Sequence, residues 1–390
     1  MRILMVTPYP PTRDGIAAYA VQSVRALRAA GHQVEVLSPG PSAAHHHLDL
    51  VGPRGALALA RRVRDYHRVI VQFHPDFFYR PGASAWQRAL EGLALTAAFG
   101  RARSVEVVVH EVDGRHGRRT TLHGQVTRRM WRSVDLVRVH TERDRQNFSR
   151  DFGVPRARIQ VIDHGAHFVA CTGHDRASAR ASLHVPPGAF VFLSIGFIQP
   201  HKGFDRAVRA FADLGVRHGR LDVVGSVRVE EPAYLAHRDE LAALVDATQG
   251  AYLHDGFVSD ELFDRWIVAS DVVVLPYRSI WSSGVLERAR LFGRPVIATA
   301  VGGLPEQATA AGVVLVSDEV ELRQAMRAAA GLGADRAVRS RPWPGPDTGS
   351  GTGPDTDLRA RVQEEVVARA AAERGYRRPA TRADGQPTLG

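Results

Sequence analysis

Short apolar runs alternate with longer stretches of helical periodicity in the first part of the chain. The opening cycle consists of an apolar run at 2–7, an amphipathic stretch at 16–30 and a second apolar run at 33–37. This order predicts a strand, a helix and a strand. Further strands are predicted at 68–73, 104–110 and 135–140, and further helices around 84–99 and 119–133. Strands that alternate with helices indicate a parallel sheet covered by helices.

The same alternation restarts after a polar stretch at 171–188, which ends in two prolines and predicts an inter-domain linker. The strands expected beyond it lie at 189–196, 220–225, 250–257, 270–277 and 294–300. We therefore predict an α/β protein with two Rossmann-like, doubly wound parallel-sheet domains. They span 1–170 and 189–332 and face each other across a cleft, where ligands bind at the carboxyl ends of the strands.

The composition changes after residue 332. Residues 333–357 are rich in Pro, Gly, Ser, Thr and Asp, which predicts a flexible connector. A C-terminal helix is expected at 358–377, and a disordered tail at 378–390.

The composition is that of a soluble globular protein with room for two domains, because the 390 residues are 44% hydrophobic and 24% charged. A single cysteine, Cys171, excludes an intramolecular disulfide. The start of the chain lacks the pattern of a signal peptide, and no apolar run reaches the roughly 18 residues of a membrane-spanning helix. We expect a cytoplasmic protein.

Positive charge is concentrated in the first half of the chain. The net charge is +10, and residues 1–175 hold 25 arginines against 15 acidic residues, which accounts for the whole excess. This half suits an anionic membrane surface, nucleic acid or a phosphorylated substrate, or it is arginine-rich with no such partner. Of the 51 basic residues only Lys202 is a lysine, so this position calls for a specific role.

The segment 277–299 predicts an anion site. It runs from a strand end through a polar loop into a helix, so Ser282 or Ser283 can cap that helix. The free backbone amides of the first turn then point at the cleft. These amides belong to Gly284, Val285 and Leu286. Glu287 falls in the same turn, where it either accepts hydrogen bonds from vicinal sugar hydroxyls or only caps the helix.

The segment 194–211 predicts a diphosphate site. It passes from a strand through Gly196 and a short loop to Lys202, at the start of an amphipathic helix. An ammonium there opposes the helix dipole unless a phosphate compensates it. A solvent-exposed lysine without a ligand is the alternative.

These segments resemble, in the expected order, the retaining glycosyltransferases of family 4 (glycosyl transferases group 1), which have the GT-B fold. The resemblance covers about residues 1–332. Its motifs are TPYPPTRDGIAAY at 7–19, VVVHEVD at 107–113, VIDHGAHF at 161–168, GFIQPHKGFDRAVRAF at 196–211, GVLERARLFGRPVIAT at 284–299 and VGGLPEQ at 301–307.

The resemblance implies a role for each matched position. Lys202 would bind the donor diphosphate, and Glu287 the nucleotide ribose. The backbone from Ser283 to Leu286 would contact phosphate or sugar. Gly15 would let its loop approach the phosphates, and His110 would lie beside the transferred sugar and the acceptor. No metal or other cofactor is expected, because fixed cations and helix amides stabilise the leaving diphosphate.

Three positions depart from the family pattern. Phe197 stands where the family usually has an arginine, which Arg13 or Arg278 would replace. Ser279 stands in place of a first glutamate that addresses the sugar, and Asp14-Gly15 in place of two glycines. We interpret these departures as divergence in specificity.

Two other patterns each allow two interpretations. The run His45-His46-His47 suits a solvated loop better than a metal site. The stretch around 118–132 combines arginines with Met130 and Trp131, which predicts either contact with an anionic membrane or an ordinary surface helix. Its arginines are Arg118, Arg119, Arg128, Arg129 and Arg132.

The sequence predicts a metal-independent, retaining hexosyltransferase. It would move a sugar from a UDP- or GDP-sugar to an acceptor hydroxyl of a lipid-linked, polysaccharide or natural-product precursor, at the inner face of the cell membrane. The alternatives are a non-catalytic sugar-nucleotide-binding protein and a sugar-nucleotide epimerase. Nucleic acid is not expected as a partner, because no nucleic-acid-binding module is recognised.

Overall fold

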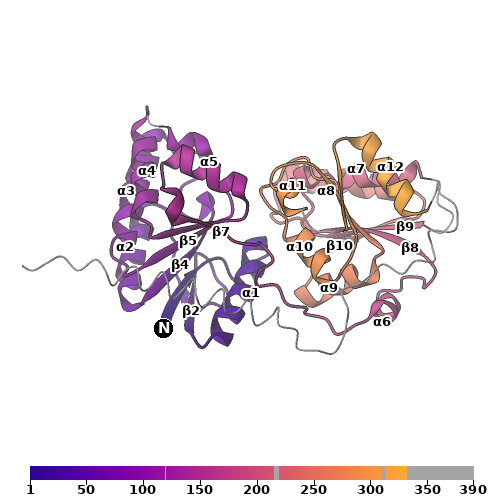
Figure 1. Cartoon of the computed structure of the whole chain (residues 1–390), viewed down its shortest axis with the longest axis horizontal. Coiled ribbons are helices and arrows are strands. Elements are labelled where there is room, and N and C mark those ends of the chain that lie inside the picture. The colour runs from indigo at the N-terminus through magenta and orange to yellow at the C-terminus, as the bar shows by residue number, and fades with distance from the viewer. Residues whose placement is uncertain (119, 215–218, 309–311, 332–390) are drawn as a thin grey trace, which may run out of the picture. The chain divides into compact units, whose positions relative to one another are not determined.

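The computed structural model describes residues 1–118, 120–214, 219–308 and 312–331. They contain two parallel sheets with helices packed on them, each built from one part of the chain (Figure 1). The predicted connector, C-terminal helix and tail at 333–390 lie outside the described residues.

The first sheet has seven strands in the order β3-β2-β1-β4-β5-β6-β7. They are β1 (Arg2–Val6), β2 (Gln33–Ser38), β3 (His46–His47), β4 (Arg68–Phe73), β5 (Val105–Val109), β6 (Leu136–Val139) and β7 (Ile159–Val161). All neighbours are parallel. The expectation of a loop at His45–His47 is wrong in part, because His46–His47 pairs with β2 as an edge strand.

Both faces of this sheet are buried. The first sheet's helices are α1 (Gly15–Ala29), α2 (Gly52–Arg62), α3 (Ala85–Phe99), α4 (Leu122–Ser133) and α5 (Glu142–Phe152). Helices α2 to α5 lie on one side of the sheet and α1 on the other (Figure 1). Leu4 and Val6 of β1 belong to the core shared with α2 to α5, whereas Ile3 and Met5 belong to the core shared with α1. This alternation follows from the two-residue period of a strand.

The second sheet has six parallel strands in the order β10-β9-β8-β11-β12-β13. They are β8 (Phe190–Ile195), β9 (Gly219–Gly225), β10 (Ala251–Asp255), β11 (Val272–Leu275), β12 (Val296–Thr299) and β13 (Val313–Val316). The helices are α7 (Phe204–Ala212), α8 (Pro232–Asp246), α9 (Asp260–Ala269), α10 (Gly284–Leu291), α11 (Leu304–Gln307) and α12 (Glu319–Ala329). A single large apolar cluster joins these strands and helices.

The segment between the sheets is not an extended linker throughout, because it contains α6 (Arg176–Ser182). Arg180 of α6 is buried, and its guanidinium donates to Asp271 Oδ2 at 2.7 Å and to the Ala269 carbonyl at 2.9 Å. These bonds attach α6 to the second sheet.

The expectation that α4 exposes Met130 and Trp131 for contact with a membrane is wrong. Met130 and Trp131 are fully buried, and Arg128 is also buried, where it donates to the Asp151 carbonyl at 2.6 Å. The apolar side of α4 therefore belongs to the core, as for an ordinary surface helix. Arg119 lies outside the described residues.

Candidate active site

The first turn of α10 follows β11 through a polar loop. Ser283 is its N-cap, because its Oγ accepts from the Leu286 amide at 3.3 Å. The expectation of three free amides is therefore wrong for Leu286. The amides of Gly284 and Val285 have no hydrogen-bond partner among the described residues. They remain available to an anion at the helix start.

Glu287 lies in this first turn and is buried. Its carboxylate accepts from Gln307 Nε2 at 3.0 Å and from Arg290 Nη1 at 2.9 Å. Burial raises the pKa of Glu287 to about 7, and the charge of Asp163 acts in the same direction. Glu287 does not cap the helix, since the Ser283 amide donates instead to Gln307 Oε1 at 2.8 Å. Sequence reasoning missed Gln307, although it ends the quoted motif at 301–307.

Lys202 ends the 3-10 turn η5 (Pro200–Lys202), directly before α7. Gly203 separates them with φ 62°, and a Cβ there would collide with the Pro276 carbonyl. The Lys202 Nζ lies 4.2 Å from the centroid of the Tyr277 ring, and no carboxylate pairs with it in the described part of the chain. Burial lowers the pKa of Lys202 to about 8. A cation without an acidic partner suits an anionic ligand.

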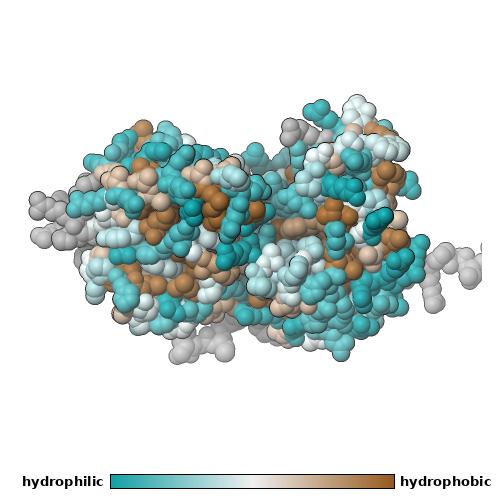
Figure 2. Space-filling view, turned by 180° about the vertical axis from the view of Figure 1, so that it is seen from behind, coloured by the Kyte–Doolittle hydropathy of each residue, from teal (hydrophilic) through white to brown (hydrophobic). Residues whose placement is uncertain are grey.

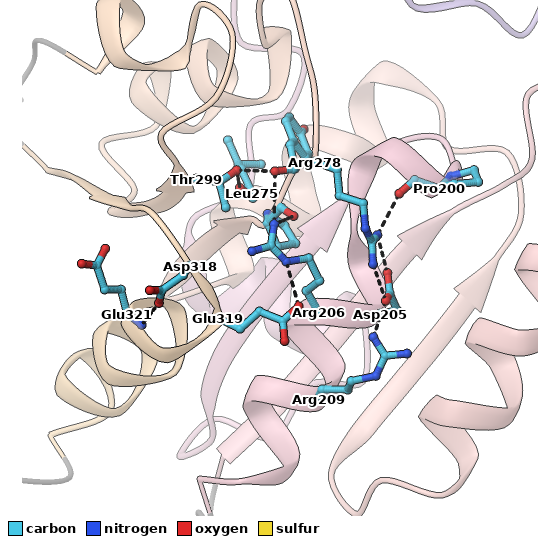
Figure 3. Close-up of polar contacts among 12 residues, drawn as sticks. Pro200, Asp205, Arg206, Arg209, Leu275, Arg278, Thr299, Asp318, Glu319 and Glu321 are labelled. Atoms are coloured by element: carbon cyan, nitrogen blue, oxygen red, sulfur yellow. Dashed lines mark hydrogen bonds and ion pairs between the residues drawn. The ribbon is translucent and has the colours of Figure 1, made fainter.

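Arg278 is not free to replace the missing arginine. Its guanidinium donates to both carboxylate oxygens of Asp205, at 2.8 and 2.7 Å, and to the Pro200 carbonyl at 2.9 Å (Figure 3). Burial acts to raise the pKa of Asp205, but Arg278 and Arg209 together lower it to about 2. Arg278 therefore braces the η5 turn rather than facing a ligand.

Three histidines gather at the carboxyl ends of neighbouring strands. His110, His140 and His164 follow β5, β6 and β7 respectively. The ring centroids of His140 and His164 are 4.2 Å apart, and those of His110 and His140 are 5.6 Å apart. Tyr19 of α1 completes the group, with its ring 5.1 Å from His110 and 5.2 Å from His164.

Burial is the largest cause of a lowered pKa for all three imidazoles. The pKa of His140 falls to about 4, and those of His110 and His164 fall well below their ordinary value. The rings are therefore neutral at pH 7. Sequence analysis singled out only His110. The signal that could have found the other two is their position just past a strand end, where parallel-sheet proteins place ligand-binding residues. His140 follows β6 directly, and His164 lies three residues after the end of β7.

Gln72 of β4 fixes the orientation of His110. Its Oε1 lies 2.7 Å from His110 Nε2, and its amide nitrogen faces the Met5 sulfur at 3.4 Å. An amide oxygen only accepts, so Nε2 carries the ring proton and Nδ1 keeps its lone pair. A neutral His110 can thus accept a hydrogen bond from a hydroxyl.

Close contacts connect these segments. Ser282 Oγ lies 3.2 Å from His164 Nδ1. A Cβ built on Gly165 would lie 2.9 Å from the Glu287 Cβ. A Cβ on Gly196, at the end of β8, would lie 4.0 Å from Val285. The loops after β7, β8 and β11 therefore converge at the first turn of α10.

Gly15 is the first residue of α1, and Asp14 caps that helix by accepting from the Ile16 amide at 2.7 Å. A Cβ on Gly15 would meet no atom within 4 Å. The space beside the first loop is therefore open, as a loop that approaches phosphates requires.

Comparisons with known proteins identify the family of the chain. Residues 13–170 match the family model "Glycosyltransferase Family 4", and residues 189–330 match "Glycosyl transferases group 1". The chain belongs to glycosyltransferase family 4. The predicted resemblance is thus confirmed, and the two matched ranges contain every strand of the two sheets except β1.

Among curated relatives, the D-inositol 3-phosphate glycosyltransferase of Nocardioides is 31% identical over 183 residues, which is 44% of this chain and 40% of that protein. The enzyme of the same name from Kineococcus radiotolerans is 34% identical over 182 residues, with 44% and 41% covered. The matched part spans about two fifths of the length of these relatives.

Solved structures show the same fold. HepE from Anabaena in complex with UDP aligns with a TM-score of 0.65 at 14% identity, covering 94% of this chain and 100% of that one. Sucrose-phosphate synthase from Thermosynechococcus elongatus has a TM-score of 0.65 at 17% identity, with 96% and 100% covered. The predicted GT-B fold is therefore confirmed.

Proposed function

We propose that this protein transfers a sugar from a nucleoside diphosphate donor to an acceptor hydroxyl, with retention at the anomeric carbon. The observation that carries the proposal is the convergence at α10. The two open amides and the buried Glu287 lie beside the loop of His164 there. Lys202 lies beside Tyr277, and its charge contributes to lowering the pKa of His164. Each group suits one part of such a donor.

The chemistry follows from the charges. Negative charge develops on the diphosphate as the glycosidic bond breaks, and Lys202 with the amides of Gly284 and Val285 would stabilise it. Glu287 would accept hydrogen bonds from the ribose. His110, neutral with a free Nδ1, would accept a hydrogen bond from a hydroxyl of the sugar or of the acceptor. We expect transfer without a metal ion, because these groups supply the stabilisation, so activity should survive EDTA.

For the donor we propose a UDP- or GDP-sugar. The structural relative HepE has been captured with UDP and with UDP-glucose, which supports a UDP-sugar. For the acceptor we propose an anionic or lipid-linked glycan precursor. The arginine-rich first half supports this choice, as do the relatives named for D-inositol 3-phosphate.

The test is thermal unfolding with a panel of UDP-, GDP- and ADP-sugars, followed by product analysis with the donor that binds. A ligand at about 100 times its Kd raises the free energy of unfolding by about 2.7 kcal/mol. We expect this shift with one donor and its loss in Lys202→Ala. Binding without transfer or slow hydrolysis would favour a non-catalytic protein. Conversion of the donor without any acceptor would favour an epimerase.

We further propose that the protein works in the cytoplasm, at the anionic inner face of a membrane, through α3 rather than α4. Apolar side chains reach the surface in patches (Figure 2). Trp86, Leu90 and Leu93 of α3 are 62, 42 and 47% exposed, and their spacing places them on one face of the helix. The adjacent helices present Arg54 and Arg129 to solvent. An apolar face beside exposed cations suits an anionic lipid surface. None of the described helices has both the length and the apolar character needed to cross a bilayer.

Co-sedimentation with vesicles tests this site. We expect binding to vesicles that contain phosphatidylglycerol, weaker binding at high salt, and a loss in Trp86→Asp/Leu90→Asp. Val320→Asp, which changes an exposed apolar residue on α12, is the matched control. Equal vesicle binding by the two variants would rule out the α3 site.

A further inference from the structure

The family resemblance implied an arginine at position 197, but this chain has Phe197 there. Phe197, half-buried after Gly196, cannot donate to a phosphate. Arg278 is held by Asp205 and Pro200, and the Arg13 guanidinium lies 5.6 Å from the centroid of the Phe257 ring. Of the two arginines that the sequence offered as substitutes, Arg278 is therefore held by an acidic partner, whereas Arg13 is exposed and contacts the Phe257 ring.

Arg228 lies on the loop beside Phe197. It follows β9, which pairs with β8, and the pairing continues past the strand ends because the Ile198 amide donates to the Ser226 carbonyl at 2.9 Å. A Cβ on Gly225 would collide with the Gly196 carbonyl, so only glycine allows the two loops to run this close. The sheet thus brings Arg228 to the loop from which the family's arginine is missing.

The surroundings of Arg228 belong to the donor site. Its Nη1 lies 3.6 Å from Asp14 Oδ2, beside Gly15, and its side chain is one-third exposed. Its positive charge contributes to lowering the pKa of His201, the neighbour of Lys202, and that of Glu111, the neighbour of His110. Arg228 is therefore close to three segments that carry candidate site residues.

We propose that Arg228 supplies the second cation for the donor diphosphate, in the role that an arginine at position 197 would fill. This inference rests on the proposed function. Arg228 makes one ion-pair contact with Asp14, at the long distance of 3.6 Å. Because a guanidinium has five N–H donors, Arg228 keeps donors for phosphate oxygens. The ion pair holds the side chain beside the first loop until a phosphate arrives.

Calorimetric binding of UDP, GDP and ADP, each compared with its monophosphate, tests the inference. For the nucleoside diphosphate that wild type binds, Arg228→Ala should weaken affinity about 10- to 100-fold, the value of a charge-assisted hydrogen bond. The monophosphate should lose much less, and Arg228→Lys should fall between. Arg238→Ala is the matched control, because Arg238 is 31% exposed and pairs with Asp255 at 3.3 Å. It should bind like wild type.

Adding Phe197→Arg to Arg228→Ala should restore diphosphate affinity, because it returns the cation from the neighbouring loop. Unchanged diphosphate binding in Arg228→Ala, or an equal loss for monophosphate and diphosphate, would overturn the inference while the proposed function stands. If wild type binds none of the three diphosphates, the proposed function fails, and this inference fails with it.

Discussion

At the scale of single residues, burial sets the protonation of the candidate site. Lys202 loses hydration, and its pKa falls to about 8, whereas the pKa of the buried Glu287 rises to about 7. Both shifts disfavour the charged form in the absence of ligand. A diphosphate would reverse the first shift, because it favours the ammonium. Donor binding should therefore be coupled to proton uptake at Lys202.

Lys202→Arg tests this coupling. In wild type, diphosphate affinity should fall as pH rises through 8, because the free lysine loses its proton near that value rather than near 10.5. An arginine stays charged throughout this range, so the variant should show a flatter profile. The measurement is Kd by calorimetry from pH 6.5 to 9.5. The variant also controls for titration of the nucleotide itself, and parallel profiles would contradict the prediction.

Glu287→Gln should make the ligand-free protein more stable than wild type, by an amount that grows as pH rises. With a folded-state pKa of about 7 and an ordinary value of 4.5, the folded protein retains a proton that the unfolded chain releases. The contribution of Glu287 to the free energy of unfolding is therefore fully present below about pH 4.5. It is lost as pH rises to 7, and the total loss is at most about 3 kcal/mol. The variant would escape this loss, because an amide does not titrate. Denaturation at pH 5 to 8 should show the two proteins diverging, whereas Glu240→Gln, at an exposed site, should follow wild type.

At the scale of elements, α10 is tied to the chain that follows it. Gln307 of α11 accepts from the Ser283 amide and donates to Glu287, so it holds the cap and the carboxylate in one network. The open amides of Gly284 and Val285 are presented by this network. The geometry of the predicted anion site thus depends on a residue about twenty positions further along the chain.

Ser283→Ala should destabilise the protein by about 1 kcal/mol, because the Leu286 amide loses its cap. Thermal or urea unfolding measures the change. Ser282→Ala is the control, since Ser282 contacts His164 instead of capping the helix. If Ser282→Ala were the more destabilising of the two, the assignment of the cap would be wrong.

At the scale of the molecule, the candidate site is assembled from both sheets. The histidines follow β5, β6 and β7 of the first sheet, whereas Lys202 and α10 belong to the second. The Arg143 amide also donates to the Glu306 carboxylate at 3.1 Å, a further contact between segments far apart in sequence. A bound donor should therefore contact several segments that are distant in the sequence.

Amide hydrogen exchange, measured with saturating nucleoside diphosphate, should reveal whether one ligand contacts these segments together. We expect slower exchange together in 164–168, 199–203 and 284–287, because one ligand would order all three segments. The edge strand His46–His47 serves as an internal control and should exchange at the same rate with and without ligand. Protection confined to 199–203 would contradict a site shared by the two sheets.

Much of the fold could be predicted from the sequence because its strands and helices arise from patterns of neighbouring residues. Apolar runs and helical periodicity placed β1, α1, β2 and five strands of the second sheet, but missed β13. The family motifs placed Lys202 and Glu287 on their turns. The short edge strand at His46–His47 could not be found this way, because its pairing depends on β2 rather than on its own two residues.

The sequence by itself determined the two-sheet architecture, the family and the residue types of the candidate donor site. Only the tertiary structure decided which groups are available. In that structure Met130 and Trp131 are buried, and Arg278 is paired with Asp205. The Leu286 amide donates to its cap, and His140 and His164 lie beside His110. The physical reason is that periodicity and caps act over a few residues, whereas burial, ion pairing and pKa depend on neighbours that are distant in the chain.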